Sequence, residues 1–255
     1  MFPDTNDNVN SQKIQRRDFL AKLTLGSTNL IIGSEMTKAE ADGNIRRPKS
    51  ADNRGVQSRI YPLFVSTWAF GKAANDAALE NYQQGGSRLD AVETGIRVTE
   101  ADVSNASVGV GGIPNADGVV QLDACIMDGP GHRAGSVGAI EDIAHPISVA
   151  RRVMEQTPHV MLAGDGASKF ALEQGFEPAN LLTEARQKEW ENWLDKERKT
   201  PHSDAHDTIT LLALDENGDI AAGCSTSGWG YKLPGRVGDS PIIGSGLYID
   251  NQVGA

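Results

Sequence analysis

The chain has 255 residues, of which 39% are hydrophobic, and a formal net charge of −10. This length and hydrophobic content suit a single domain with a sizeable core. The negative charge, without a cluster of Lys and Arg among aromatic residues, argues against nucleic acid as a partner. No apolar run is long enough to span a bilayer, so we expect no membrane partner either.

The first 41 residues have the pattern of an export signal. Arg16-Arg17-Asp18-Phe19-Leu20 resembles a twin-arginine signal, a modestly apolar stretch follows at residues 23–33, and Ala39-Glu40-Ala41 fits the small-x-small cleavage rule. We therefore expect residues 1–41 to be a signal peptide that directs the protein to the periplasm or beyond. The alternative is an ordinary disordered basic tail.

Beyond this segment, short strands and helices alternate. Residues 43–60 are polar and aperiodic, as is typical of a linker. Hairpin signals outnumber βαβ signals, so we predict an α+β fold with an antiparallel sheet. The hydrophobic patterns predict strands at 62–67, 119–127, 134–140, 159–163 and from 208 onward, and helices at 73–83, 89–100, 147–156 and 183–199.

Local signals support several of these boundaries. Gly85-Gly86 indicates the end of a helix, and Pro146 suits a first helical turn. The run Asn115-Ala116-Asp117-Gly118 is typical of a hairpin turn. Asp165, which lies between two glycines, is interpreted as a turn residue.

Cysteine and histidine give no sign of a metal or cofactor. Cys125 and Cys224 lie in strand-like apolar runs, so we expect buried thiols, although a single disulfide between them stays open. The five histidines show no ligand spacing, and no phosphate-binding glycine loop precedes a helix. We therefore expect no metal and no cofactor.

The strongest functional signal lies at Asp207-Thr208. A polar stretch at 195–207 ends there, and a strand-like run from Thr208 to Leu214 begins. A threonine at such a junction can become a new N-terminus after cleavage, and its free α-amine can then take the proton of its own hydroxyl. Taken alone, the same residue fits a threonine that merely opens a strand.

Further motifs, in a fixed order, decide between these interpretations. They are Ser66-Thr67-Trp68-Ala69-Phe70-Gly71, Ser107-Val108-Gly109, Leu122-Asp123-Ala124-Cys125-Ile126-Met127-Asp128, Thr157-Pro158-His159, Gly164-Asp165-Gly166, His206-Asp207-Thr208, Thr226-Ser227-Gly228 and Gly235-Arg236-Val237-Gly238-Asp239-Ser240-Pro241. Together they closely resemble the glycosylasparaginases, which are N-terminal nucleophile hydrolases. The resemblance runs from about Tyr61 to the last residue.

This resemblance implies a four-layer α-β-β-α sandwich and self-cleavage between Asp207 and Thr208. Residues 42–207 would then form the α chain of a single catalytic domain, and residues 208–255 the start of the β chain. In the family the pattern continues beyond Ala255 with a Thr-Gly pair that binds the oxyanion, so we expect an incomplete β chain here. The resemblance also implies a homodimer of αβ units.

The resemblance also assigns the site residues. Thr208 would attack the side-chain amide of a glycosylated asparagine, a small-molecule substrate whose α-amino and α-carboxyl groups are free, and Thr226 would orient it. Arg236 and Asp239 would bind the α-carboxylate and the α-ammonium. Trp68 would face the sugar, and Ser107 would lie near the nucleophile. His206 is expected to be scaffold.

Each assignment has a plainer alternative. Arg236 and Asp239 could form a surface ion pair, Thr226 could be a strand-end hydroxyl, and Trp68 could be a core aromatic. Thr210 stands where the family usually has glycine, and its bulk is expected to crowd the new N-terminus. Val110 replaces a frequent aromatic, which puts that wall of the pocket in doubt.

Two other functions compete with glycosylasparaginase. One is an isoaspartyl peptidase or plant-type asparaginase, which shares the nucleophile and the fold. The other is a non-catalytic exported protein that binds an amino acid. The full motif from Gly235 to Pro241, together with His206-Asp207 before the threonine, favours glycosylasparaginase.

Overall fold

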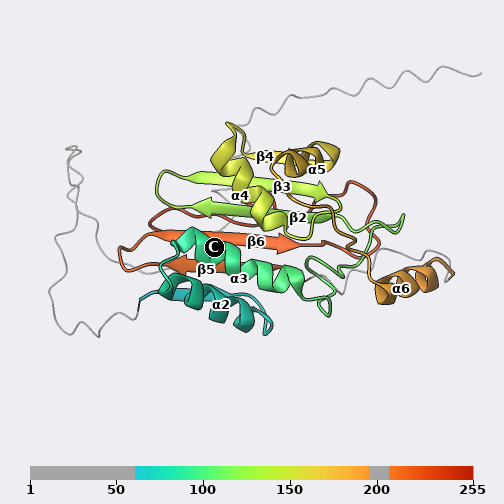
Figure 1. Ribbon diagram of the computed structural model, residues 1–255, viewed down its shortest axis with the longest axis horizontal. Helices are drawn as coiled ribbons and strands as arrows, with labels where there is room; N and C mark the ends of the chain where they lie inside the picture. Colours follow the sequence, from blue (N-terminus) through green and yellow to red (C-terminus); the bar gives the residue numbers. More distant parts are fainter. Residues whose placement is uncertain (1–60, 196–206, 255) are drawn as a thin grey trace, which may run out of the picture. The chain divides into compact units, whose positions relative to one another are not determined.

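A six-stranded sheet in the order β1-β5-β6-β2-β3-β4 forms the centre of the fold (Figure 1). The computed structural model describes residues 61–195 and 207–254, which belong to one compact unit, Val56–Ala255. Neighbouring strands are antiparallel, except for the parallel pair β3–β4, so the predicted α+β class is confirmed. The strands are β1 (Leu63–Ser66), β2 (Leu122–Asp128), β3 (Arg133–Ile140), β4 (Met161–Ala163), β5 (Ile209–Leu214) and β6 (Ile220–Thr226).

Three helices cover one face of this sheet. They are α2 (Gly71–Gln83), α3 (Arg88–Ala101) and α4 (Pro146–Gln156), and they lie side by side in Figure 1. Helix α3 begins with a capping box, in which Ser87 and Asp90 bond reciprocally, and it buries Val92 and Ile96 against the sheet. Gly223 of β6 permits this close approach, because a Cβ there would lie 2.7 Å from Ile96 Cδ1.

The opposite face of the sheet has a smaller core. Cys125, Met127 and Cys224 point to this face and pack against Leu247 and Ile249 from the C-terminal loops. The register places Leu63 and Val65 of β1 opposite Leu214 and Leu212, and both β1 side chains are about half exposed, at 49% and 52%. Among the described residues this face is therefore only partly covered.

Several predicted elements need correction. Gly164 begins a helix, α5 (Gly164–Glu173), so Asp165 lies in a first helical turn and not in a simple turn. The turn at Asn115 forms, with Gly118 N–H bonding to Asn115 O at 3.1 Å, but β2 starts at Leu122 instead of residue 119. The last helix, α6, spans Glu184–Asp195. The predictions for residues 1–41, 43–60 and 196–206 concern parts of the chain outside the described residues.

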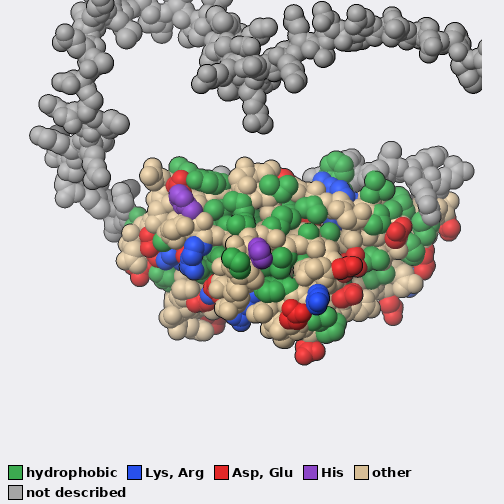
Figure 2. Space-filling model, turned by 90° about the horizontal axis from the view of Figure 1, so that it is seen from above, with side chains coloured by type: hydrophobic (Ala, Val, Ile, Leu, Met, Phe, Trp, Pro, Cys, Tyr) green, Lys and Arg blue, Asp and Glu red, His purple; other side chains and the backbone are tan. Residues whose placement is uncertain are grey.

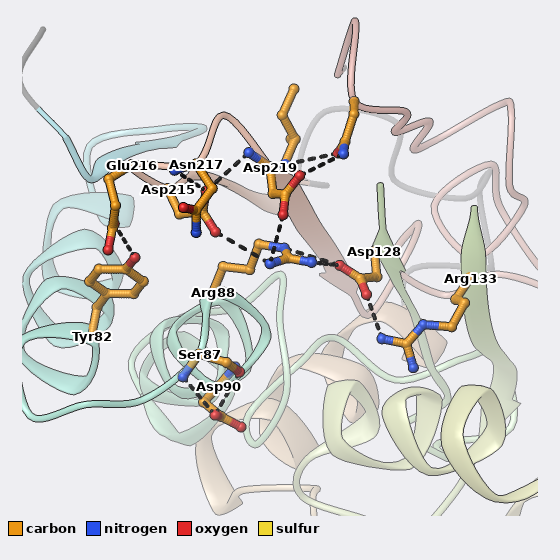
Figure 3. Close-up of polar contacts among 12 residues, drawn as sticks. Tyr82, Ser87, Arg88, Asp90, Asp128, Arg133, Asp215, Glu216, Asn217 and Asp219 are labelled. Carbon is orange, nitrogen blue, oxygen red and sulfur yellow. Dashed lines mark hydrogen bonds and ion pairs between the residues drawn. The ribbon is translucent and has the colours of Figure 1, made fainter. Parts of the chain in front are cut away.

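An arginine network fixes one end of the sheet (Figure 3). Arg88, at the start of α3, donates to Asp128 at the end of β2 at 2.7 Å and to Asp215 in the β5–β6 turn at 3.3 Å. Asp219 lies 3.5 Å from the same guanidinium, and Arg133 pairs with Asp128. The network thus joins α3, β2 and the β5–β6 hairpin at the end of the sheet opposite to Thr208.

The surface of the described part offers few other features. No described helix is long and apolar enough to cross a membrane, and no group of three metal-ligating side chains occurs among the described residues. Val160, Met161 and Leu172 are exposed near the β4 edge, and Figure 2, seen from above, shows hydrophobic side chains among polar ones.

A hollow of about 340 Å³ lies between α3 and α4. Its charged lining is largely paired, because Arg151 contacts Asp90 at 2.6 Å, Glu93 at 2.8 Å and Glu155 at 2.8 Å. We therefore interpret this hollow as a structural ion-pair cluster between two helices.

Candidate active site

Thr208 lies immediately before β5, at the end of the sheet where β6 ends. Because Ile209 pairs with Ser225 in an antiparallel register, Thr208 lies beside Thr226. Asp123 pairs with Thr226 on the other side. The register therefore brings Thr208, Thr226 and Asp123 together on adjacent strands, on the face opposite to the helices.

Thr67 holds the backbone of the proposed nucleophile. Its hydroxyl donates to the Thr208 carbonyl at 2.6 Å and accepts from the Thr210 N–H at 3.0 Å. The Thr67 N–H in turn donates to the Thr210 carbonyl at 3.0 Å. This clamp extends the β1–β5 pairing past the end of β1 and fixes the direction in which residue 208 enters the strand.

The Thr208 hydroxyl lies close to the hydroxyl of Ser240. Its Oγ1 lies 3.4 Å from Oγ of Ser240, which is buried in the loop after Arg236. The backbone carbonyl of Ser240 accepts from the Cys125 thiol at 3.0 Å. The loop that carries the expected substrate-binding residues is therefore attached to the sheet directly beneath the nucleophile.

Two buried thiols lie below Thr208. Cys125 and Cys224 are buried, as the sequence predicts, and both are free. They face each other across β2 and β6. The hydrogen bond to Cys224 raises the pKa of Cys125 well above its ordinary value, and burial acts in the same direction. The Cys125 thiol is therefore interpreted as a neutral core group. The pKa of Cys224 is lowered instead, above all by its hydrogen bond with Cys125.

Thr226 and Ser107 lie together, but the Thr226 hydroxyl bonds to the backbone of Ser107 and not to the expected nucleophile. The Thr226 hydroxyl donates to the backbone carbonyl of Ser107 at 3.4 Å and accepts from the Gly228 N–H at 3.0 Å. Ser227 N–H also donates to the Ser107 carbonyl at 2.7 Å. No hydrogen bond among the described residues joins Thr226 to Thr208, so the orienting role of Thr226 stays a prediction.

Arg236 is held by an aromatic ring and two glycines. Its guanidinium carbon lies 4.6 Å from the centroid of the Trp229 ring, a cation–π geometry. A Cβ on Gly228 or Gly238 would lie 3.0 or 3.2 Å from Arg236 Nη1. Among the described residues Arg236 and Asp239 form no ion pair within 4.0 Å, which leaves both charges available to a ligand.

Trp68 directly follows Thr67, whose hydroxyl bonds to the backbone of Thr208. It follows β1, its side chain is 59% exposed, and its φ of 61° is unusual for a residue other than glycine. This exposure excludes the alternative of an ordinary core aromatic. Its expected contact with the sugar stays a prediction.

A buried carboxylate supports the arginine loop. Asp123 is fully buried, and its two oxygens accept from the Ala139 N–H at 2.7 Å and from the Gly238 N–H at 3.4 Å. Lys232 is buried as well, and its ammonium donates to the Gln121 and Ser227 carbonyls at 3.0 and 2.9 Å. Asp123 thus binds the loop from Trp229 to Gly238 at its end, and Lys232, within the loop, attaches it to Gln121 and Ser227.

The two residues that depart from the family pattern, Thr210 and Val110, lie in different surroundings. Thr210 is half-buried on the same face as Thr208, and its hydroxyl bonds to Cys224, so it packs into the sheet beside the nucleophile. Val110 is partly buried against the main core, and its N–H donates to the Glu100 carbonyl at 2.8 Å.

Comparison with known proteins decides the family. A model of the asparaginase family matches residues 63–255. The chain belongs to the asparaginase family. It is 48% identical over 242 residues to N(4)-(beta-N-acetylglucosaminyl)-L-asparaginase from Elizabethkingia miricola, which covers 94% of this chain and 68% of that protein. The glycosylasparaginase resemblance seen in the motifs is thereby confirmed.

Other relatives carry two kinds of name. The N(4)-(beta-N-acetylglucosaminyl)-L-asparaginase of Mus musculus is 40% identical over 227 residues, covering 76% of this chain and 65% of that protein. An isoaspartyl peptidase/L-asparaginase of Rattus norvegicus is 43% identical over 190 residues, covering 70% of this chain and 56% of that protein. The chain spans about two thirds of the length of the two glycosylasparaginases.

This asparaginase-family chain contains site residues that the sequence did not single out. Thr67, Asp123 and Ser240 lie within the motifs given above, and Lys232 lies between two of them, but only the folded structure shows what they contact. A signal for Thr67 was available, because it follows a predicted strand and directly precedes Trp68. Nothing in the sequence pattern indicates that the Lys232 ammonium is buried.

Proposed function

We propose that the protein is an amidohydrolase that cleaves the bond between N-acetylglucosamine and the side chain of free asparagine. The observation that carries this proposal is the position of Thr208, which precedes a central strand, is clamped by Thr67 and lies beside Thr226. The names of its relatives support the same substrate.

The first step proposed is self-cleavage. The Thr208 hydroxyl oxygen attacks the Asp207 carbonyl carbon, the peptide C–N bond breaks, and the freed nitrogen takes up the hydroxyl proton. Water then hydrolyses the resulting ester, which leaves the Asp207 carboxylate and a Thr208 with a free α-amine. That amine becomes the general base for the second reaction.

In the second reaction the same hydroxyl attacks the substrate. Its oxygen adds to the side-chain amide carbon of the glycosylated asparagine, and the proton passes through the α-amine to the leaving glycosylamine. An aspartyl ester of Thr208 remains, and water releases aspartate. Thr226, which accepts from Gly228 N–H and lies next to Thr208, is proposed to orient the nucleophile.

Recognition of the amino-acid head is assigned to Arg236 and Asp239. Arg236 is preorganised on Trp229 and has no carboxylate partner within ion-pair distance among the described residues, which suits a bidentate bond to an α-carboxylate. Asp239 is exposed on the same loop and can accept from an α-ammonium. Trp68 and Ser107 are proposed to border the substrate.

The competing activity is isoaspartyl peptidase or asparaginase, because a relative at 43% identity carries that name. The complete protein should be assayed on aspartylglucosamine, β-aspartyl dipeptides and asparagine. A kcat/KM highest for aspartylglucosamine supports the proposal, whereas a preference for β-aspartyl dipeptides contradicts it. An uncut protein that binds aspartate without turnover would instead support the binding-protein alternative.

Three wider features are proposed with the function. The half-exposed Leu63 and Val65 on the second face support a second sheet packing there in the complete protein, as a four-layer sandwich requires. The Arg16-Arg17 motif supports export to the periplasm. A homodimer of αβ units is inferred from the family resemblance, and light scattering of the processed protein tests it.

A further inference from the structure

Lys232 is a buried charged side chain, and the need to fill space in the core does not explain why a lysine lies there. Its side chain is 1% exposed, and it is among the largest fully buried side chains. Its ammonium donates to the carbonyls of Gln121 and Ser227, and its third N–H has no acceptor among the described residues. A buried ammonium without a bonded carboxylate is costly, so an apolar side chain would serve packing better.

Lys232 lies against the residue that also contacts the substrate-binding arginine. A Cβ added to Gly228 would lie 3.2 Å from Lys232 Nζ and 3.0 Å from Arg236 Nη1. Gly228 itself has a φ of +68°, which favours glycine. The side chains of Lys232 and Arg236 therefore both approach Gly228, which has no side chain and so leaves room for the two cations.

The charge in this region is not balanced. Burial, above all, lowers the pKa of Lys232, while Asp123 acts to raise it and Arg236 acts to lower it. Asp123 on β2 is the acidic group that interacts with Lys232, and Arg236 on the loop is the basic one. The two cations Lys232 and Arg236 face one buried carboxylate, Asp123, which is already bonded to two backbone N–H groups, whereas Asp239 on the same loop is exposed. The buried side of this loop therefore favours an added anion.

We propose that Lys232 is a specificity-determining positioning residue for the substrate α-carboxylate, which it attracts from behind Gly228 while Arg236 makes the direct bond. This inference rests on the proposed function, because it takes the α-carboxylate to bind at Arg236. It also explains why the buried ammonium is held by the Ser227 carbonyl, in the turn that carries Thr226 and Gly228.

The test compares two ligands that differ only in charge at the α-carboxyl group. Dissociation constants of L-aspartate and of its α-amide are measured by calorimetry on the complete processed protein and on Lys232→Met. We expect aspartate binding to weaken by about tenfold, the scale of one charge lost at short range in a protein. Binding of the α-amide should change by less than about threefold.

An equal loss for both ligands would mean that Lys232 only supports the loop, and the proposal would be overturned. Lys72→Met is the matched control, because Lys72 is an exposed lysine paired with Asp76 on α2, and both constants should stay unchanged. The measurement is independent of turnover. A wild-type protein that binds aspartate but does not hydrolyse aspartylglucosamine would contradict the proposed function alone.

A second measurement covers the case in which Lys232→Met does not fold. In the wild type, the ratio of the two dissociation constants is followed as pH rises. Lys232 loses its proton more readily than an ordinary lysine, since burial lowers its pKa, so the preference for aspartate over the α-amide should decline in the alkaline range. The α-ammonium groups of the two ligands titrate at different pH values, so each dissociation constant is first corrected with the titration curve of its own ligand. A constant ratio up to the pH of unfolding would overturn the proposal.

Discussion

The Thr67 hydroxyl donates to the carbonyl of Thr208 at 2.6 Å, although the two residues are 141 positions apart. The same oxygen accepts the Thr210 N–H, so one side chain bonds to the backbone on both sides of Ile209. Thr67 lies next to Trp68, whose backbone is left-handed. The entry of the nucleophile into the sheet is thus set by the end of β1.

Replacement of Thr67 by valine should slow both self-cleavage and turnover. Valine keeps the shape but removes the donor to the Thr208 carbonyl and the acceptor for Thr210, at a cost of about 0.5–1.5 kcal/mol for each of these exposed hydrogen bonds. The rate of two-band formation on a denaturing gel measures the first effect. Thr67→Ser keeps the hydroxyl and should behave close to wild type; an equally slow serine variant would contradict the clamp.

Thr208→Ala should leave one intact chain, because no nucleophilic oxygen remains at the cleavage site. Thr208→Ser and Thr208→Cys should be partly processed. The check is a gel followed by N-terminal sequencing of the smaller band. Cleavage of the alanine variant at the same bond would point to an external protease and remove the nucleophile assignment.

Arg236→Ala should weaken substrate binding by about 1.5–3 kcal/mol, the usual value of a hydrogen bond to a charged group, while processing survives. KM and the extent of cleavage are measured on the same preparation. Gly238→Ala is a milder variant, because its new Cβ would press on Nη1 at 3.2 Å, and it should raise KM less than the arginine deletion. For Asp239, equal activity on substrates with a blocked α-amine would exclude its proposed role.

Arg88→Met should be strongly destabilising. It would leave the almost fully buried Asp215 without its cation and Asp128 with Arg133 alone, and breaking a buried pair typically costs about 3–5 kcal/mol. Urea unfolding in the uncut Thr208→Ala background measures the change. The matched control is Lys72→Met, which breaks an exposed pair on α2 worth at most about 0.5 kcal/mol. Similar midpoints for the two variants would contradict the role of the network.

The capping box of α3 should contribute stability that acid removes. Burial acts to raise the pKa of Asp90, but hydrogen bonds from Ser87 and from Arg151 outweigh it, and the pKa lies below its ordinary value. A carboxylate with a depressed pKa stabilises the fold above its unfolded pKa of about 3.9, and this contribution is lost as pH falls through the folded value.

Ser87→Ala should therefore cost about 1 kcal/mol at neutral pH, as the loss of a helix cap usually does. The difference from wild type should shrink as pH falls through the folded-state pKa of Asp90, which lies below its ordinary value. A difference that stays constant from neutral to acid pH would show that the carboxylate does not take part.

The sequence predicts the parts of this fold that depend on local pattern. The boundaries of α2, α3, α4 and β5 agree within about two residues with apolar periodicity and capping signals. Helix α5 was missed because Gly164-Asp165-Gly166 has the composition of a turn, and the helix gains its stability by burying Ala167 and Ala171.

The site could be predicted only as far as motifs reach. Thr208, Thr226 and Arg236 stand in segments that resemble a known family, and the sheet places these segments together. The contacts of Thr67, Ser240 and Lys232 depend on which strands are neighbours, and the spacing along the chain carries no information about that. Long-range register is a property of the assembled sheet.

The strand order β1-β5-β6-β2 has a consequence for the cut protein. Strands β5 and β6 would belong to the new chain, and β1 and β2 on either side of them to the old one. The two polypeptides would be interleaved in one sheet, so neither could leave without breaking two sets of ladder hydrogen bonds. Once unfolded and separated, they would have to meet again to refold, and recovery after denaturation should depend on protein concentration. The uncut Thr208→Ala chain should instead refold at a rate independent of concentration.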